Sequence, residues 1–442
     1  MRPIFLLSLF LIVSFSHQAI LGTLKTGIEG YLFAYPLVDF EATKSYVGSI
    51  NVFSHVPYLP TPDTRIIVRP NVDTLYSYAF LDLTTEPLYM MMPDTNDRYY
   101  VLEIMDAWTN VFGSYGKRTT GTQKQEFFIT NNEWQGEVPQ GLIHVVSPTK
   151  NAWIAGRIQT NGDLDVENVT LIQQQMILRE YNQSVSRVLY NSDETNKTSP
   201  DFVVGNMTLE EFFNNFTASM KVNAPAAADA PMLDNLKKIG IEPGKNWNPE
   251  TLSILDKMTF KLGADIGRGI VQYGMTIESR LLNVNGWIEK TDAVGNYSTD
   301  YKTRALVAHV GMAANLPIDA VYCNGYFDDA GNELNGDNSY VLHLEKEDIP
   351  PVNAFWSLTM YDQESYLVPN EANKYAIRDR DPLVFNADGS LDIYIQNAKP
   401  EDAKIPNWLP APKAKFNLTM RLYWPKQSVL DNTWKPKGIK KI

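Results

Sequence analysis

The side chains best suited to chemistry lie close together in the first third of the chain. They are three arginines, two carboxylates and an amide: Arg69, Asn71, Asp73, Arg98, Asp106 and Arg118. Asp106 ends a strongly apolar segment, where an unpaired charge is costly, so it requires one of the arginines as a partner. The charges either form a structural ion pair, or they form a polar site. In such a site Arg69 would anchor the substrate and Asp106 would act as acid or base.

Aromatic residues near these charges would provide the apolar wall of such a site. Tyr76 and Trp108 are the nearest candidates, and a second cluster in the last third contains Trp356, Tyr361 and Asn370. Rings combined with amides suit a sugar or another polar ring, whereas core packing is the competing explanation. If both clusters serve one site, they must face one cavity between two β domains.

Several established catalytic motifs are absent from the sequence. It contains no Gly-x-Ser-x-Gly, no His-Glu-x-x-His and no P-loop, and the glycines of 263–269 lie in a helical pattern that favours close packing. The single cysteine, Cys323, excludes an intramolecular disulfide and a Cys-rich zinc site. Acidic residues at 328–337 and 379–388 suit calcium, but they are also typical of ordinary turns. We expect no cofactor and no metal, and whether the protein is an enzyme stays open.

Composition and charge exclude some classes of protein. The 442 residues suggest two or three domains, and 44% hydrophobic residues are typical of a globular chain. Asp and Glu (51) outnumber Lys and Arg (39), and the formal net charge is −12. Binding to nucleic acid requires a basic surface, so this charge argues against it.

The N-terminal residues have the pattern of a secretory signal peptide. Arg2 is followed by an apolar run over 4–15 and by small residues near Ala19, which predicts a cleaved segment over 1–22. The run is shorter than the roughly 20 residues of a membrane span, and an uncleaved anchor is the alternative. No later segment is apolar enough to span a bilayer, so we expect no membrane span in the mature chain.

The sequence also carries seven signals for N-linked glycosylation. They are Asn168, Asn182, Asn196, Asn206, Asn215, Asn296 and Asn417. Each is the acceptor of an Asn-x-Ser/Thr pattern, which is used on exposed segments of secreted proteins. The signal peptide and these sites together predict a secreted, extracellular glycoprotein.

The hydrophobic pattern first predicts a helix and then a β domain. The helix is expected over 24–43, with Pro36 ending or kinking it. Alternating apolar residues within 73–160 predict several strands. The segment 23–170 is therefore expected to be an antiparallel β-sandwich.

The pattern then becomes helical before strands return. One helix is expected over 171–190, another after a capping box at Thr208–Glu211, and a third over 249–282. These make 171–295 a helical module. Alternating segments return beyond it, so 296–442 is expected to be a second β domain.

Eight segments resemble a two-part family of unknown function. The family catalogued as domain of unknown function 1254 is similar to segments 35–39 (YPLVD), 69–77 (RPNVDTLYS), 81–83 and 98–108. Its usual partner, domain of unknown function 1214, is similar to segments 353–362 (NAFWSLTMYD), 388–391, 407–412 and 421–425. The resemblance implies an immunoglobulin-like sandwich, a central helical insertion and a C-terminal jelly roll. It also implies homo-oligomers such as trimers, and it implies no established reaction.

These patterns lead to one expected function and one rival. We expect a secreted protein that binds or processes a small polar or carbohydrate-like substrate in a pocket between two β domains. The expected binding residues are Asn71, Asp73, Tyr76, Arg98, Trp108, Arg118, Trp356, Tyr361 and Asn370. The rival is a structural glycoprotein that forms a trimer, surface layer or filament. For the tail over 429–442 two interpretations stay open: an arm that binds a partner, or a segment docked on its own domain.

Overall fold

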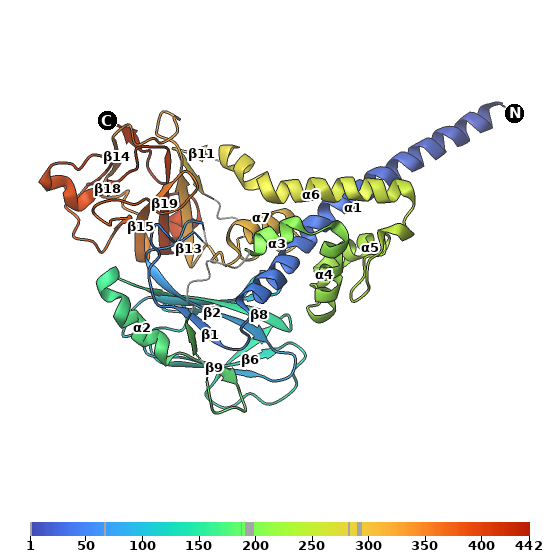
Figure 1. Cartoon of the computed structure of the whole chain (residues 1–442), viewed down its shortest axis with the longest axis horizontal. Helices are drawn as coiled ribbons and strands as arrows, with labels where there is room; N and C mark the ends of the chain where they lie inside the picture. The colour runs from blue at the N-terminus through green and yellow to red at the C-terminus, as the bar shows by residue number, and fades with distance from the viewer. Residues whose placement is uncertain (1, 66–67, 187, 191–198, 282, 290–293) are drawn as a thin grey trace.

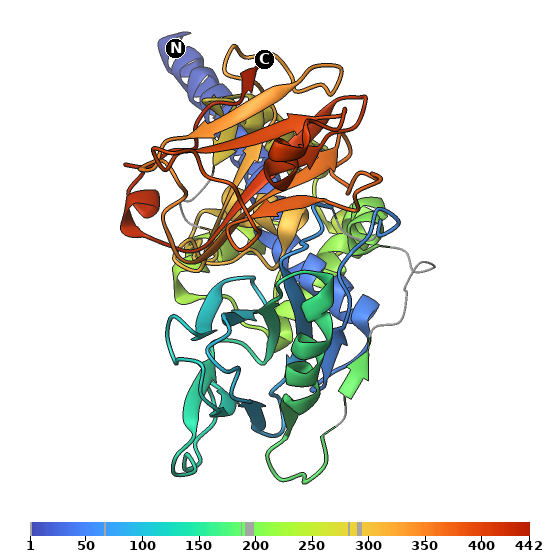
Figure 2. The ribbon, with the colours of Figure 1, turned by 90° about the vertical axis from the view of Figure 1, so that its left-hand side faces the viewer.

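The chain folds into two β units and a group of helices (Figure 1). The computed structural model describes residues 2–65, 68–186, 188–190, 199–281, 283–289 and 294–442. Within these residues the protein is mainly β, as the sequence predicts. Its strands form four sheets. The N-terminal β unit lies below the C-terminal β unit, and the helices lie beside both (Figures 1 and 2).

The N-terminal β unit is built from two sheets that share one core. Their strand orders are β10-β1-β2-β8-β4-β5 and β7-β6-β3-β9. Leu75, Leu102 and Ile154 from the first sheet pack with Met90 and Phe127 from the second. The strands are β1 Phe53–Val56, β2 Thr74–Asp82, β3 Leu88–Met92, β4 Tyr100–Asp106, β5 Val111–Gly116, β6 Gln125–Asn131, β7 Ile143–Ser147, β8 Asn151–Gln159, β9 Ile177–Glu180 and β10 Val188–Tyr190.

The C-terminal β unit also consists of two sheets around one core. Their orders are β11-β12-β13-β19-β15-β16 and β18-β17-β14-β20. The strands are β11 Asn283–Val284, β12 Trp287–Glu289, β13 Ala320–Gly325, β14 Tyr340–Leu344, β15 Val352–Asp362, β16 Ala376–Arg378, β17 Leu391–Gln396, β18 Trp408–Pro410, β19 Phe416–Pro425 and β20 Lys440–Lys441, with the short helix α8 Gln427–Leu430. The immunoglobulin-like and jelly-roll topologies stay predictions.

The tail after β19 docks on its own unit, as one of its two interpretations expects. β20 pairs with β14. The Trp434 indole nitrogen donates to the Asp348 carbonyl at 3.1 Å, and the Trp287 indole nitrogen donates to the Lys437 carbonyl at 2.7 Å. Val429, Trp434 and Ile439 of the tail are buried because they complete the core of the C-terminal unit.

The helical module combines the first helix with helices more than 150 residues later. Its helices are α1 Arg2–Val47, α3 Pro200–Asn206, α4 Leu209–Val222, α5 Ala230–Lys237, α6 Ile254–Leu281 and α7 Tyr301–Gly311. α1 and α6 approach closely because their glycines face each other. A Cβ atom added at Gly263 would lie only 3.0 Å from the Cα atom of Gly27. The capping box of α4 is confirmed, with Thr208 and Glu211 bonded reciprocally. No helix in the described part of the chain is long and apolar enough to cross a membrane.

Two helix predictions are corrected by the fold. Pro36 does not end the first helix, which continues to Val47 because the residues on both sides of the proline are buried in the helical core. The helix expected over 171–190 is wrong: α2 Val166–Gln175 ends early, and β9 follows. Met176 and Leu178, two positions apart, are both buried in the core of the N-terminal unit, and β9 pairs with β3. This segment is therefore a strand, because every second side chain is buried.

Candidate functional site

The two β units meet through polar faces. Along β19, Leu418, Met420 and Leu422 point into the C-terminal core, so the alternate side chains of Arg421 and Tyr423 point toward the N-terminal unit. We call the layer between them the interdomain seam. It comprises the loop over 69–73, the outward-facing side chains of β2, β4 and β8, the segment over 313–319, and the outward-facing side chains of β13, β15 and β19.

A buried carboxylate holds one end of the seam together. Asp73 is fully buried, and its Oδ1 accepts from Arg380 at 2.8 Å and from Arg378 at 3.2 Å. The Ser357 hydroxyl donates to the other carboxylate oxygen. Burial alone would raise the pKa of Asp73, but Arg380 and Arg378 outweigh it and hold the pKa below its usual range. Asp73 therefore stays ionised and links the two units.

Arg69 and Tyr361, which the sequence places in separate clusters, come together here. The Arg69 guanidinium donates to the Thr419 hydroxyl at 2.7 Å and also to Tyr326. Arg421 donates to the Tyr361 hydroxyl at 2.7 Å and to the backbone carbonyl of Arg69 at 2.9 Å. Arg69 is thus held by the C-terminal unit, and its side-chain hydrogen bonds go to Thr419 and Tyr326 rather than to Asp106.

Tyr76 lies where the arginines of both units converge. The Asn71 amide donates to the Tyr423 hydroxyl at 2.7 Å and to the Tyr76 hydroxyl at 3.3 Å. The Arg157 guanidinium lies 5.3 Å from the centre of the Tyr76 ring. Burial favours a higher pKa for Tyr76, but Arg157 and Arg421 overcome it and lower the pKa. Tyr76 is partly exposed, so this edge of the seam reaches solvent.

Unpaired polar atoms converge beneath Tyr76. The Arg157 side chain is 6% exposed and donates through Nη2 to the Ala313 carbonyl at 2.6 Å. Its Nε and Nη1 atoms, the Glu103 Oε2 atom and the Asn315 Nδ2 atom have no hydrogen-bond partner among the described residues. Nη1 and Oε2 are 4.0 Å apart, which is too far for a direct hydrogen bond. Buried polar atoms without partners are rare, and ordered water or a small bound molecule would satisfy them.

The neighbouring contacts place these atoms in one site. The second oxygen of Glu103 accepts from the Leu316 amide at 2.8 Å, and Tyr322 donates to Asn315 at 3.1 Å. Burial raises the pKa of Glu103 to about 8, although Arg157 acts in the opposite direction. Glu103 is therefore largely a neutral acid at pH 7. Arg157 on β8 thus lies near both a carboxyl with a raised pKa on β4 and a tyrosine with a lowered pKa on β2, and each of these two groups can exchange a proton with a substrate.

Asp106 and both predicted tryptophans lie outside the seam. Asp106 accepts from the backbone amides of Trp108 and Asn110, each at 2.9 Å, rather than from an arginine of the predicted set. Burial raises the pKa of Asp106 to about 6, and its bonds to Asn110 oppose the shift. Trp108 stacks on Phe33 in the helical core, and Trp356 belongs to the core of the C-terminal unit. One cavity containing all of these residues is not formed.

The remaining predicted residues have structural partners. Arg118 forms a two-point ion pair with Asp319, at 2.6 and 2.9 Å, at the edge of the seam. The Asn370 amide closes a loop by donating to the Lys374 carbonyl at 3.0 Å. No group of three or more His, Cys, Asp or Glu side chains that could hold a metal occurs in the described ranges.

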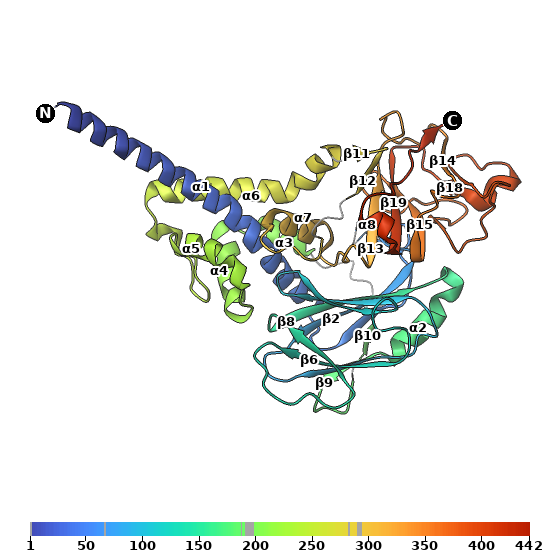
Figure 3. The same ribbon diagram turned by 180° about the vertical axis from the view of Figure 1, so that it is seen from behind.

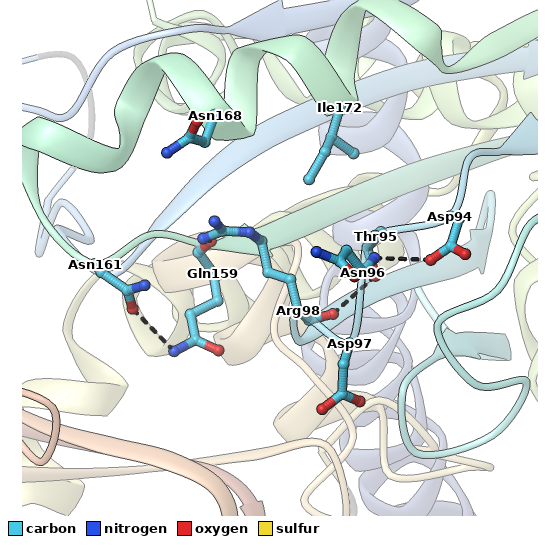
Figure 4. A pocket seen from close by; sticks show the side chains of 9 residues that line it. All are labelled: Asp94, Thr95, Asn96, Asp97, Arg98, Gln159, Asn161, Asn168 and Ile172. Carbon is cyan, nitrogen blue, oxygen red and sulfur yellow. Dashed lines mark hydrogen bonds between the residues drawn. The ribbon is translucent and has the colours of Figure 1, made fainter.

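Arg98 lies in a separate polar pocket of about 560 Å³ (Figure 4). Asn168 and Ile172 line it from α2, and the other lining residues come from the loop before β4 and the end of β8. The Arg98 guanidinium is bound at two points by Asp165, at 2.5 and 2.9 Å. Because this ion pair satisfies the arginine, we rank the pocket below the seam as a binding site.

Sequence reasoning missed the central residues of the site. Glu103 interrupts an apolar strand, and Arg157 interrupts another, but neither belongs to a motif. The pairing of β4 with β8 brings them to one face of the first sheet. A lone charge inside an apolar strand is the only signal that could have identified them, and it also occurs at ordinary ion pairs.

The fold and the seam define a protein of two β units joined through a polar layer, and comparisons identify its architecture. Residues 50–180 match the family described as "Protein of unknown function (DUF1254)", and residues 319–427 match "Protein of unknown function (DUF1214)". The chain therefore belongs to the two-part family that its sequence resembles.

A solved structure of a bacterial protein shares this fold. The VPA0106 protein from Vibrio parahaemolyticus has a TM-score of 0.70 and 23% identity, and the match covers 95% of this chain and 100% of that one. A putative uncharacterized protein from Burkholderia cenocepacia has a TM-score of 0.46 and 13% identity, with 98% and 97% covered. No curated protein sequence matches the chain. At 23% identity, the likeness to the Vibrio protein concerns the fold alone.

Proposed function

We propose that this protein is a secreted glycoprotein that binds a small hydroxylated carboxylate, such as a sugar acid, in the interdomain seam. The observation that carries the proposal is the group of unpaired buried atoms on Arg157, Glu103 and Asn315. It replaces the expected site around Asp106 with one in which Arg69, Asn71 and Tyr76 belong to the surrounding layer.

The chemistry of these side chains selects the ligand class. The unpaired Nε and Nη1 groups of Arg157 are positively charged donors, which favour a carboxylate oxygen as acceptor. The Asn315 amide and a protonated Glu103 can each donate to a hydroxyl or carboxylate oxygen. Tyr76 and Tyr322 are partly exposed and provide ring surfaces of the kind that contact sugars. The shifted pKa values of Glu103 and Tyr76 also suit proton transfer during turnover, although the unpaired atoms require only binding.

A ligand comparison tests this proposal. We expect glucuronate to raise the thermal unfolding temperature of the secreted protein, and glucose to raise it much less because it lacks the carboxylate. Arg157→Gln and the milder Asn315→Ala should abolish the shift. Arg98→Gln is the matched control, because it alters the other polar pocket. A shift that survives Arg157→Gln but disappears in Arg98→Gln would move the site to that pocket.

The proposal of secretion has support from two positions in the fold. α1 projects beyond the rest of the molecule at its N-terminal end (Figure 1). Thr23 is hydrogen-bonded to Asp256 of α6 at 3.3 Å. Cleavage after residue 22 would therefore leave α1 beginning where it meets the helical module. Sequencing the N-terminus of the secreted protein tests this, and a retained Arg2 would contradict it.

Five glycosylation sites are exposed: Asn168, Asn182, Asn206, Asn215 and Asn296. Asn196 lies outside the described residues. Asn417 is buried on β19, and its amide donates to the Asp362 carbonyl at 2.6 Å, so we do not propose it as an acceptor. Mass spectrometry should show that Asn215→Gln removes one glycan and that Asn417→Gln removes none.

Assembly into a homo-oligomer is the second candidate function. The specific observation in its favour is an exposed apolar face on the longest helix of the 200–311 region. The immunoglobulin-like and jelly-roll topologies implied by the family belong with this proposal, because jelly rolls are frequent assembly modules.

A further inference from the structure

A glycosylation acceptor forms part of the wall of the polar pocket around Arg98 (Figure 4). Asn168 begins the pattern Asn168-Val-Thr170 on α2, and its side chain is exposed. Ile172 follows four residues later on the same face of the helix, and both side chains point toward the other lining residues (Figures 3 and 4). The volume of about 560 Å³ is that of an ordinary small-molecule site. A glycan on Asn168 and a ligand in the pocket would therefore occupy the same space.

Asp165 fixes the direction of the Asn168 amide. The Asn168 Nδ2 atom donates to Asp165 Oδ1 at 3.0 Å. The same carboxylate accepts from Arg98 at two points and from the Asn161 backbone amide at 2.9 Å. A glycosylated asparagine keeps one hydrogen on Nδ2, so the bond to Asp165 persists while the sugar takes the place of the other hydrogen. The first sugar thus starts from a side chain that is already held at the pocket wall.

The charges that line the pocket are already paired. Arg98 is bound at two points by Asp165. Asp97 is paired with Lys117 at 2.9 Å, and Asp94 accepts from a backbone amide at 2.8 Å. An ionic ligand would have to compete with one of these interactions, so the lining favours a neutral molecule.

Amide side chains supply the remaining polar groups of the pocket. Asn96, Gln159 and Asn161 carry donors and acceptors of the kind that bind sugar hydroxyls. The bond from Gln159 Nε2 to Asn161 Oδ1 is long at 3.4 Å, so these two amides can turn to a sugar at little cost. Ile172 is half-buried and offers apolar surface to the methyl of an N-acetyl group. This mixture matches N-acetylglucosamine, the neutral sugar with which N-linked glycans begin.

From this placement we infer that the pocket binds the first N-acetylglucosamine of a glycan attached to Asn168. The inference rests on the glycosylation proposed above, and it gives this one glycan a structural role, which is to link α2 to the loop before β4. The covalent tether gives the sugar an effective concentration in the millimolar range, so weak contacts keep it bound. Asn215 on α4 does not line this pocket, so its glycan has no such role.

Substitution and trimming test the inference on the secreted full-length protein. Asn168→Gln and Thr170→Ala both remove the acceptor pattern and should lower the thermal unfolding temperature by about 2–4 °C, the shift expected for loss of roughly one hydrogen bond. Thr170→Ser keeps the pattern, and Asn215→Gln removes a glycan elsewhere, so both should unfold like wild type. An endoglycosidase that leaves a single N-acetylglucosamine at each occupied site should preserve the difference between wild type and Asn168→Gln, because only the first sugar is bound.

Unglycosylated protein separates the effect of the sugar from that of the side chain. The same substitutions are made in protein secreted from cells whose N-glycosylation is blocked, and the effect of the sugar is the difference between the two preparations. Gln159→Ala removes one amide from the pocket wall. It should lower the unfolding temperature of glycosylated wild type but not that of glycosylated Asn168→Gln, because it acts through the bound sugar.

Four results would overturn the inference. The first is an Asn168 that carries no glycan by mass spectrometry: the proposed glycoprotein stands if Asn215 carries one, and it fails as well if no site does. The second is an equal cost of Asn168→Gln in glycosylated and unglycosylated protein. The third is an equal loss in Asn215→Gln, which would mean that any glycan stabilises the fold. The last is stabilisation of glycosylated wild type by free N-acetylglucosamine that Gln159→Ala abolishes, because a pocket open to a free sugar is not filled by the tethered one.

Discussion

Glu103 offers a direct test of the seam, because its protonation state links the site to the stability of the fold. The carboxyl is fully buried on β4, and its Oε2 atom has no hydrogen-bond partner in the described ranges. Burial raises its pKa from the ordinary 4.5 to about 8. The unfolded chain exposes the same carboxyl to water and restores its ordinary pKa.

The sign and size of the effect follow from this difference. Between about pH 4.5 and 8 the native state holds a proton that the unfolded state has released, so the free energy of unfolding falls as pH rises. At 1.36 kcal/mol for each pH unit, the loss over this window is roughly 4–5 kcal/mol. Glu103→Gln keeps the shape of the side chain but does not titrate, so it should abolish this loss.

Urea unfolding at about pH 5, 6.5 and 8 measures the effect as a difference between variant and wild type. We expect Glu103→Gln to gain stability relative to wild type as pH rises. The exposed Glu364 provides the control, since Glu364→Gln should follow wild type. Parallel curves for Glu103→Gln and wild type would refute the reasoning, because they would mean that Glu103 is ionised in the native state.

Three further predictions concern the packing of the fold. His55 is buried, with its Nδ1 atom 2.8 Å from the Ser77 hydroxyl, and burial lowers its pKa to about 4. Because the unfolded chain takes up a proton at this histidine first, lowering the pH from 6.5 to 4 should lower the free energy of unfolding by about 3 kcal/mol. His55→Gln should flatten that dependence in urea titrations, and an unchanged slope would contradict the prediction. Thr208→Ala should lower stability by about 1 kcal/mol through loss of the α4 cap, whereas no change in the urea midpoint would count against it. Gly263→Ala should cost about 1–3 kcal/mol, because a Cβ would lie 2.3 Å from the Leu24 carbonyl oxygen. A Cβ at Gly269 meets nothing within 4 Å, so Gly269→Ala should be neutral or stabilising, and equal losses would refute the packing argument.

Local patterns predicted many individual elements. Strands β2 and β17 appear where alternation indicated them, and along β17 buried residues alternate with half-buried ones. The α4 cap was also predictable, since its hydrogen bonds join residues three positions apart. The prediction failed where a distant partner decides: β9 is a strand because β3 lies beside it, although its apolar spacing also fits a helix.

The site was harder to predict than the individual elements, because its residues come from distant parts of the sequence. Arg69 and Asn71 were assigned to one polar cluster with Tyr76 as part of its apolar wall, and in the structure Arg69 and Asn71 are bonded to residues of the C-terminal unit. Asp106 was also singled out, yet its turn with Asn110 satisfies it locally. Glu103 and Arg157 carry only a weak local signal, because a single charge within an apolar strand also occurs at ordinary ion pairs.

The sequence by itself determined the two-part family, the mainly β composition and the local caps and strands, because these depend on residue type and short-range spacing. Only the tertiary structure decided that α1 packs on α6 through facing glycines, and that the polar faces of two β units meet in one seam. Both outcomes require contacts between segments more than 200 residues apart. Such contacts are selected by the shape and charge of whole faces, which no short stretch of sequence contains.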